Sequence, residues 1–416
     1  MLPNKLLLHI KPAPVIKMLS LTDTTFDNCI KCTVCTTRCP VAEARPDYPG
    51  PKQAGPDGER FRIKSPGLYD DALKYCTNCK RCEVACPSNV HIGTIIQKAK
   101  ARHDGFKQGP REFMLSHTDL MGTLSSTTAP IVNVVTAMKP VKKLLDKTLG
   151  VDERRTLPKY TFQTFRKWFG KHAGNQERFD RKITYFHGCY TNYNVPAVGK
   201  DLVAVLNAIN IGVRLTAKEK CCGVPLIANG FLKKARKNAD LNMTQFAKSL
   251  DAGSEAVISS SSSCAMTLRD EYPDMLDVDN SAFKDQIQFV SRFLIKEFAS
   301  GNKPEMKPLN LKVAYHSPCH LIRMGGVVHT VELMREIPGL ELTLLDQNCC
   351  GLSGTYGFKK ENYDTSQKIA NKMLEQIKTT EADYIITDCE SCKMQVEMNT
   401  DHKVLHPVTL IAMALV

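Results

Sequence analysis

Residues 29–40 read CIKCTVCTTRCP, and residues 76–87 read CTNCKRCEVACP. Both runs have the pattern C-x2-C-x2-C-x3-C-P, which is typical of 4Fe-4S cluster binding. Three thiolates two residues apart can hold one side of a small cluster, and a fourth ligand from elsewhere completes it. Zinc sites instead use two separated cysteine pairs. A triplet that occurs twice, each time before a Cys-Pro pair, therefore favours iron–sulfur chemistry over zinc.

The two runs together predict a domain with two 4Fe-4S clusters. Where two such runs occur, the fourth cysteine of each run ligates the other cluster. We therefore assign the first cluster to Cys29, Cys32, Cys35 and Cys86, and the second to Cys76, Cys79, Cys82 and Cys39. The segment between the runs, residues 40–75, is rich in Pro, Gly and Asp. It predicts an irregular surface excursion, and its function is not readable from the sequence.

The chain has 416 residues, of which 43% are hydrophobic and 17 are cysteines. This length predicts two or three domains, and the apolar content excludes wholesale disorder. Clustered cysteines at this density favour metal binding in a reducing, cytoplasmic compartment over a disulfide scaffold. No apolar run approaches the roughly 20 residues of a membrane-spanning helix. We expect residues 1–22 to be a dispensable leader, with Met18 as an alternative start.

The C-terminal half contains two copies of one unit, offset by about 128 residues. The corresponding positions are Cys189 and Cys319, Cys221-Cys222-Gly223 and Cys349-Cys350-Gly351, and Cys264 and Cys392. In each unit, apolar β-like runs and helical segments alternate, which predicts α/β units with parallel strands. The expected strands are 183–186, 256–259, 311–315 and 384–387. Cysteines would then lie at strand ends, where such folds usually place their sites.

The two copies differ at one position. The second unit has Cys389, where the first has Ser261. The five thiols of the second unit predict a third iron–sulfur cluster, bound by Cys319, Cys349, Cys350, Cys389 and Cys392. The four of the first unit, Cys189, Cys221, Cys222 and Cys264, are a weaker set. Vicinal disulfides or inert buried thiols are the alternatives for both sets. Histidines occur nearby, but we name no catalytic residue.

The excess charge of the chain gathers in one cysteine-free stretch. The formal net charge is +13, and residues 98–182 contain 18 Lys and Arg against 8 Asp and Glu. Within this stretch, apolar residues recur at helical spacing with lysines between them, namely Ile131, Val135, Met138, Val141, Leu145 and Leu149. Pro140 predicts a kinked helix or two short ones. A basic amphipathic helix favours an anionic membrane surface or a partner protein. The alternative is a solvated helix packed on its own domain.

Several functions are disfavoured by missing motifs. The chain has no zinc-finger, helix-turn-helix or RNA-binding pattern, so we expect no nucleic-acid partner. It has no G-x-G-x-x-G after a strand, no Walker motif, no G-x-S-x-G and no H-E-x-x-H. One-electron centres without a hydride cofactor predict that substrate oxidation belongs to another protein of a complex.

The sequence therefore predicts an α+β multidomain chain. After the leader, a mostly helical two-cluster domain covers residues 23–107, and a basic amphipathic connecting region covers 108–182. The two Cys-Cys-Gly units cover 183–300 and 311–416. The stretch 301–308, with two prolines and a glycine, is the expected linker between the units.

Two ferredoxin runs followed by two Cys-Cys-Gly repeats resemble the iron–sulfur C subunits of anaerobic glycerol-3-phosphate dehydrogenases. The stretches that carry the resemblance include PGPKQAGPDGER, EKCCGVPLIANGF, CCGLSGTYGFKKENY and TDCESCK. The wider family includes iron–sulfur subunits of glycolate and lactate oxidation and of heterodisulfide reductase. In the last of these, the five-cysteine repeat holds a noncubane cluster, a role that would fall here on the five thiols of the second unit.

The resemblance implies a function that the spacing does not show. Such a subunit receives electrons from flavin-containing catalytic subunits that oxidise glycerol 3-phosphate to dihydroxyacetone phosphate. It passes them toward the membrane quinone pool and helps to anchor the complex, peripherally, at the cytoplasmic face of the inner membrane. Three alternatives stay open: an iron–sulfur subunit of a lactate or glycolate oxidase complex, a thiol–disulfide reductase working at the second unit, and a module that only anchors the catalytic subunits.

Overall fold

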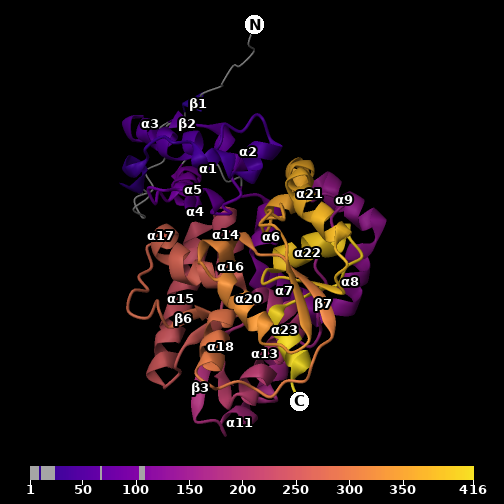
Figure 1. Ribbon diagram of the computed structural model, residues 1–416. Coiled ribbons are helices and arrows are strands. Elements are labelled where there is room, and N and C mark those ends of the chain that lie inside the picture. The colour runs from indigo at the N-terminus through magenta and orange to yellow at the C-terminus, as the bar shows by residue number, and fades with distance from the viewer. Residues whose placement is uncertain (1–8, 11–23, 66–67, 103–107) are drawn as a thin grey trace.

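The computed structural model describes residues 9–10, 24–65, 68–102 and 108–416. A small helical domain lies over two α/β units, and helices α8 and α9 lie at the outer edge beside the second unit (Figure 1). Apart from strand β1 (His9–Ile10), the expected leader lies outside the described residues. Strand β1 pairs antiparallel with β2 (Leu68–Tyr69).

The N-terminal domain is built from short helices around one longer helix. Its elements are η1 (Thr24–Asn28), α1 (Val34–Thr37), α2 (Pro40–Ala44), η2 (Gln53–Asp57), α3 (Gly58–Lys64), η3 (Asp71–Tyr75), α4 (Arg81–Val84) and α5 (Ile92–Arg102). These elements confirm the mostly helical prediction for the domain, and Ile95, Ile96 and Ala99 of α5 are fully buried in its core. The irregular excursion predicted between the cysteine runs instead contains helical turns.

The first Cys-Cys-Gly unit has a four-stranded parallel sheet with the strand order β4-β3-β5-β6. Its strands are β3 (Arg181–Phe186), β4 (Ile211–Arg214), β5 (Val257–Ser259) and β6 (Ile287–Phe289). Its helices are α12 (Gly188–Tyr193), α13 (Pro196–Ala208), α14 (Val224–Ala228), α15 (Leu232–Asp251), α16 (Ser262–Met266), η4 (Thr267–Glu271), α17 (Tyr272–Leu276) and α18 (Val290–Ala299). The predicted parallel α/β architecture is confirmed.

The second unit repeats this topology, with the strand order β8-β7-β9-β10 and parallel pairing throughout. Its strands are β7 (Leu311–Tyr315), β8 (Leu340–Leu344), β9 (Tyr384–Ile386) and β10 (Val404–Leu405). Its helices are α19 (Cys319–Arg323), α20 (Val327–Arg335), η5 (Tyr356–Phe358), η6 (Lys360–Asn362), α21 (Tyr363–Thr379), α22 (Glu390–Asn399) and α23 (Pro407–Ala414). Identical strand orders confirm that the two units are copies.

The two units pack together with an internal pseudo-twofold relation. Helix α13 of the first unit packs on α23 of the second, and α20, the counterpart of α13, packs on α18, the counterpart of α23. One apolar core therefore runs through both sheets and includes Tyr185 and Ile258 of the first and Val313 and Tyr315 of the second. The same relation turns the cysteine-bearing ends of the two sheets toward each other.

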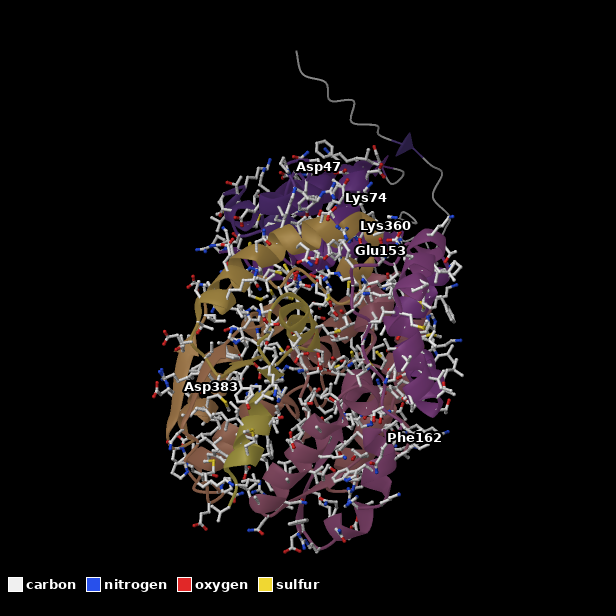
Figure 2. The ribbon with its side chains drawn as sticks, turned by 90° about the vertical axis from the view of Figure 1, so that its right-hand side faces the viewer. Asp47, Lys74, Glu153, Phe162, Lys360 and Asp383 are labelled. Carbon is white, nitrogen blue, oxygen red and sulfur yellow. The ribbon has the colours of Figure 1, made fainter. Side chains whose placement is uncertain are left out.

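The connecting region contains α6 (Pro110–Ser116), α7 (Thr118–Thr127), α8 (Ala129–Ala137), α9 (Lys139–Leu149), α10 (Phe165–Gly170) and α11 (Ala173–Gln176). Of the two forms that Pro140 allowed, the structure has the two short helices and not the single kinked one. Met138 is extended, and Pro140 lies in the first turn of α9, where its missing N–H needs no partner. The purple helices of this region lie together along one side of the molecule in Figure 2, and Phe162 projects into solvent below them.

Candidate iron–sulfur sites

Both ferredoxin runs adopt the same strained loop. The residue before and the residue after the second cysteine have left-handed backbone in each run: Lys31 and Thr33 in the first, with φ of 60° and 65°, and Asn78 and Lys80 in the second, with φ of 55° and 63°. Non-glycine residues rarely adopt this conformation, which costs on the order of 1 kcal/mol each. Such strain clusters at ligand sites, and here it curls each loop around its three thiols.

The loops bring the predicted cysteine sets together. Around Cys35, the thiols close enough to raise its pKa are those of Cys29, Cys86 and Cys32, in addition to the effect of burial. Burial and then Cys79 raise the pKa of Cys39 to about 12, and Cys76 contributes in the same direction. Cys82 is likewise surrounded by Cys79, Cys76 and Cys39. Each run thus lends its fourth thiol to the triplet of the other.

In both Cys-Cys-Gly units, the glycine makes the turn after the vicinal cysteines. Gly223 and Gly351 have φ of 103° and 73°, which side-chain-bearing residues rarely adopt. A Cβ on Gly351 would collide with the carbonyl oxygen of Ser366 in α21. With this turn in place, both vicinal thiols of each unit line the same cavity.

The thiols of each unit form a contiguous chain of contacts. In the first unit, hydrogen-bond contacts join Cys189 to Cys221, Cys221 to Cys222, and Cys222 to Cys264. In the second, they join Cys319 to Cys349, Cys349 to Cys350, Cys350 to Cys392, and Cys392 to Cys389. The first set, which the sequence made the weaker one, is therefore gathered as closely as the second.

One thiol in each unit is stabilised as a thiolate by its neighbours. Contacts with Cys349 and Cys392 lower the pKa of Cys350 to about 5, and contacts with Cys189 and Cys222 lower the pKa of Cys221 well below its usual range. Ser261 occupies the place of the missing fifth cysteine. Its hydroxyl donates to Glu390 at 3.1 Å and accepts from the Cys264 N–H, capping α16.

All nine repeat cysteines line one cavity of about 470 Å³ between the two units, and Cys79 of the helical domain also lines it. Cys189 and Cys264 follow strands β3 and β5, and Cys319 and Cys389 follow β7 and β9. The cavity therefore lies at the carboxyl ends of both parallel sheets, where the sequence placed the site. That the two sets share a single cavity was not predictable from either repeat alone.

Arg81 connects the helical domain to the second unit. Its guanidinium lies 4.0 Å from the Cys319 thiol, and Cys319 and Cys349 favour its charged form against the opposing effect of burial. Cys79, beside it, has its pKa raised to about 12 by burial and then by Cys319. This contact was not predictable from the sequence because it joins residues 238 positions apart. The only local signal was a basic residue inside a cysteine run.

The histidines near the cysteines are neutral and structural in character. Burial lowers the pKa of His187 to about 3 and that of His316 and His406 to about 4, and it also lowers the pKa of His320. His187 Nδ1 is hydrogen-bonded to the Gly188 carbonyl at 2.8 Å and lies 3.1 Å from Glu219, whose pKa burial raises to about 8, so the two side chains form no ion pair at pH 7. Among the described residues, neither ring nitrogen of His316 has a hydrogen-bond partner.

This donor set fits iron–sulfur clusters. All 17 cysteines are free thiols, and the repeat thiols are packed so closely that they disturb one another's ionisation. Sulfur donors select iron–sulfur clusters, copper(I) and zinc. The unpartnered His316 near Arg81 and Cys319 supplies the kind of N–H group that cluster sulfides accept. Within the described residues, no three His, Cys, Asp or Glu side chains converge on a single metal ion.

Comparisons with known proteins agree with this arrangement. The 4Fe-4S dicluster domain family matches residues 25–90, and the cysteine-rich domain family matches residues 183–269 and 313–397. The C subunit of the anaerobic glycerol-3-phosphate dehydrogenase of Escherichia coli K12 is 56% identical over 395 residues, which are 95% of this chain and all of that protein. The chain belongs to this family of dehydrogenase C subunits. It is therefore an iron–sulfur component of a dehydrogenase complex.

More distant relatives are similar to all or part of this dehydrogenase component. The B subunit of the fumarate reductase (CoM/CoB) of Methanothermobacter marburgensis is 26% identical over 93% of this chain and 72% of that protein. Lactate utilization protein A 2 of Bacillus cereus Q1 is 25% identical over 56% of this chain and 99% of that protein. Among solved structures, glutamate racemase of Francisella tularensis matches 56% of this chain and 79% of that one, with 15% identity and a TM-score of only 0.26.

Proposed function

We propose that this chain is the electron-transfer subunit of an anaerobic glycerol-3-phosphate dehydrogenase. It accepts electrons from flavin-containing catalytic subunits that oxidise glycerol 3-phosphate, and it delivers them to membrane quinone. The observation that carries the proposal is the continuity of the thiol sets. Cys79 of the helical domain lies close enough to Cys319 for that thiol to raise its pKa. It also lines the same cavity as all nine repeat thiols.

The chain's own residues provide four cluster sites. Cys29, Cys32, Cys35 and Cys86 form the first, and Cys39, Cys76, Cys79 and Cys82 the second. The second repeat supplies Cys319, Cys349, Cys350, Cys389 and Cys392, and the first repeat supplies Cys189, Cys221, Cys222 and Cys264. Bound iron–sulfur clusters would supply one-electron chemistry. Cys319 helps to raise the pKa of buried Cys79, so the second ferredoxin site neighbours that of the second repeat, and the two repeat sites line one cavity.

The proposal places the chain peripherally on the cytoplasmic face of the inner membrane. In the described part of the chain, no helix is both long and apolar enough to span a bilayer. Helices α8 and α9 instead expose large apolar side chains, and α9 carries four lysines. Apolar side chains beside basic ones are the combination that binds an anionic lipid surface.

The test is reduction of the clusters by the catalytic subunits. The anaerobically purified chain is mixed with the flavin-containing pair of the same complex, and glycerol 3-phosphate is added while absorbance and EPR spectra are recorded. We expect the clusters to be reduced with glycerol 3-phosphate and to stay oxidised with lactate or glycolate. Reduction by lactate or glycolate dehydrogenase subunits alone would move the assignment to another branch of the family.

Two variants sharpen this test. Cys82→Ser removes a thiol of the second cluster site, and we expect it to stop electron flow while the catalytic subunits remain bound. Release of those subunits with unchanged electron flow would instead support a module that only anchors. Rapid turnover of a disulfide by the reduced chain, lost in Cys350→Ser, would support the thiol–disulfide reductase.

A further inference from the structure

The cavity between the two units has a second half that contains no thiols. It is lined by apolar side chains from the connecting region: Met114 of α6, Met121 of α7, Val132 of α8, and Val141 and Leu145 of α9. Iron–sulfur clusters are held by cysteine thiolates, and the connecting region that lines this half has no cysteine. It is therefore a space for an apolar molecule placed directly beside the thiol sets, within a cavity whose volume is typical of small-ligand sites.

Within the described part of the chain, helices α8 and α9 form a wall between this half and solvent. Val132, Val141 and Leu145 line the cavity, whereas the opposite sides of α8 and α9 are open to solvent and expose Ile131 and Leu144 at 67% and 59%. The remaining members of this outer apolar face are Val134, Val135 and Met138. Lys139, Lys142, Lys143 and Lys147 lie on the same helix pair. An apolar molecule dissolved in a bilayer docked here would have to cross only this wall to reach the cavity.

Hydrogen bonds and an ion pair hold the helices of the connecting region against both units. The Asn133 side chain of α8 donates to the Tyr160 carbonyl and accepts from its N–H, both at 2.8 Å. On α7, Asp119 accepts from the Cys221 N–H at 2.7 Å, and on α9 Asp146 pairs with Lys360 of the second unit. The helices therefore span the gap between the two thiol sets and do not pack on one unit alone.

We propose that the apolar half of the cavity binds the ring of a quinone, which enters from the lipid across the α8–α9 wall. This inference rests on the proposed function and deepens it by naming the acceptor's site. The bound quinone takes up two electrons from the reduced iron–sulfur centres and two protons from solvent water, and it leaves as the quinol. No covalent bond to the chain forms.

A hydroxyl group is available to hold the ring. Tyr160 lines the apolar half, its position is fixed by Asn133, and burial raises the pKa of its phenol. A neutral phenol can donate a hydrogen bond to a quinone carbonyl oxygen. Ser125, which also lines this half, contacts the same phenol. Tyr160 is thus a positioning residue for the acceptor.

The test fills the apolar half without touching a thiol. Leu145→Trp places an indole in the cavity, and Thr148→Trp, three residues further along α9 on its exposed side, is the matched control. Each variant is assembled with the catalytic subunits. Three quantities are measured: cluster reduction by glycerol 3-phosphate, turnover with decylubiquinone, and binding of the fluorescent quinol analogue heptyl-hydroxyquinoline N-oxide to the resting complex.

We expect Leu145→Trp to leave cluster formation, and the reduction of the clusters by glycerol 3-phosphate, almost unchanged. The same variant should weaken analogue binding and quinone turnover at least about tenfold, the equivalent of 1.4 kcal/mol. Thr148→Trp should leave all three unchanged. Tyr160→Phe, which keeps the cavity volume, should raise the KM for decylubiquinone about two- to tenfold with little change in kcat, as expected for one lost hydrogen bond.

The outcomes separate this inference from the proposed function. Clusters that glycerol 3-phosphate does not reduce in the wild-type complex would refute the function itself. Clusters that are reduced normally, with analogue binding and quinone turnover equal in Leu145→Trp and Thr148→Trp, would overturn the quinone site alone. If Leu145→Trp does not assemble, Val132→Trp on α8 and Tyr160→Phe test the same half of the cavity.

Discussion

Gly351 shows how a single backbone position serves the site. Its φ of 73° is left-handed, and a Cβ there would collide with the Ser366 carbonyl. Gly354 is also left-handed, with φ of 62°, but no atom of the described residues lies within 4 Å of the corresponding Cβ. The two glycines therefore differ in crowding and not in backbone conformation, which makes them a matched pair.

We expect Gly351→Ala to destabilise the chain by more than about 3 kcal/mol and to lose iron from the second repeat, because strain and collision add. Gly354→Ala should cost only about 1 kcal/mol, since strain alone applies. Thermal unfolding measures the loss of stability in both variants, and the iron content per chain measures the loss of metal. The EPR signals of the ferredoxin domain show whether the rest of the chain is still folded. Equal losses in the two variants would contradict the role of crowding.

Arg81 is the residue whose charge acts on the neighbouring site. Its guanidinium lies 4.0 Å from the Cys319 thiol, where two full charges would interact by about 4 kcal/mol at an effective dielectric constant of 20. An electron added to a bound cluster is spread over the whole cluster, so the interaction energy with the Arg81 charge is only a fraction of this value. We expect Arg81→Gln to make the potential of the second-repeat centre more negative, as followed by an EPR-monitored redox titration.

Arg81→Lys is the control, because it keeps the positive charge. Its potential should lie closer to that of the native chain than the potential of Arg81→Gln does. A shift of the same size in both variants would mean that Arg81 acts through packing and not through its charge.

Among the elements, α8 and α9 show what periodicity could and could not predict. The break at Pro140 follows from proline chemistry, which predicted a kink or two short helices. A single helical count places the apolar residues on one stripe, but Ile131, Val135 and Met138 face solvent whereas Val141 and Leu145 face the cavity. The backbone turns at Met138, between α8 and α9. A helical periodicity of about 3.6 residues continued across this turn therefore wrongly places the apolar residues of both helices on one face.

The same contrast holds for the thiols. The ferredoxin triplets are local, and a rule for exchanging the fourth cysteine was enough to predict the sets around Cys35 and Cys39. The repeats predicted which cysteines correspond. They could not predict that Cys189, Cys221, Cys222 and Cys264 gather despite Ser261, nor that both sets share one cavity, because these depend on packing between units.

The outer apolar face of α8 and α9 predicts measurable lipid binding. Leu144→Glu and Thr148→Glu add the same charge one turn apart at exposed positions of α9, but only Leu144→Glu also removes a large apolar side chain. Burying one leucine contributes about 1.5–3 kcal/mol. We therefore expect Leu144→Glu to weaken sedimentation with phosphatidylglycerol-containing vesicles at least about tenfold more than Thr148→Glu. Binding of both variants equal to that of the unchanged chain would show that α9 does not contact the lipid.

At the scale of the whole molecule, four thiol sets predict the metal content. If each binds four irons, the anaerobically purified chain contains about sixteen. Cys222→Ser and Cys350→Ser should each remove about four of these, and neither should alter the signals of the two ferredoxin clusters. About twelve irons with no effect of Cys222→Ser would leave the first repeat empty, and about eight would leave both repeats empty.

The distribution of cysteines among the cores predicts the order in which the molecule loses structure. The core of the helical domain includes Cys35 and Cys82, with four further ferredoxin cysteines packed against it. The core that runs through both sheets, with Tyr185 and Tyr315, contains no cysteine. Metal binding contributes directly to folding where the ligands form the core. The two parts of the chain should therefore respond differently to loss of iron.

We expect chelation of iron under anaerobic conditions to raise amide hydrogen exchange first across residues 24–65 and 68–102, while β3 and β7 remain protected. Exchange followed by mass spectrometry at increasing chelator exposure checks the order, because each segment reports its own opening free energy. The native chain without chelator is the control. Loss of protection in β3 and β7 together with the helical domain would show that the repeat sheets also depend on metal, and that the shared apolar core does not hold them alone.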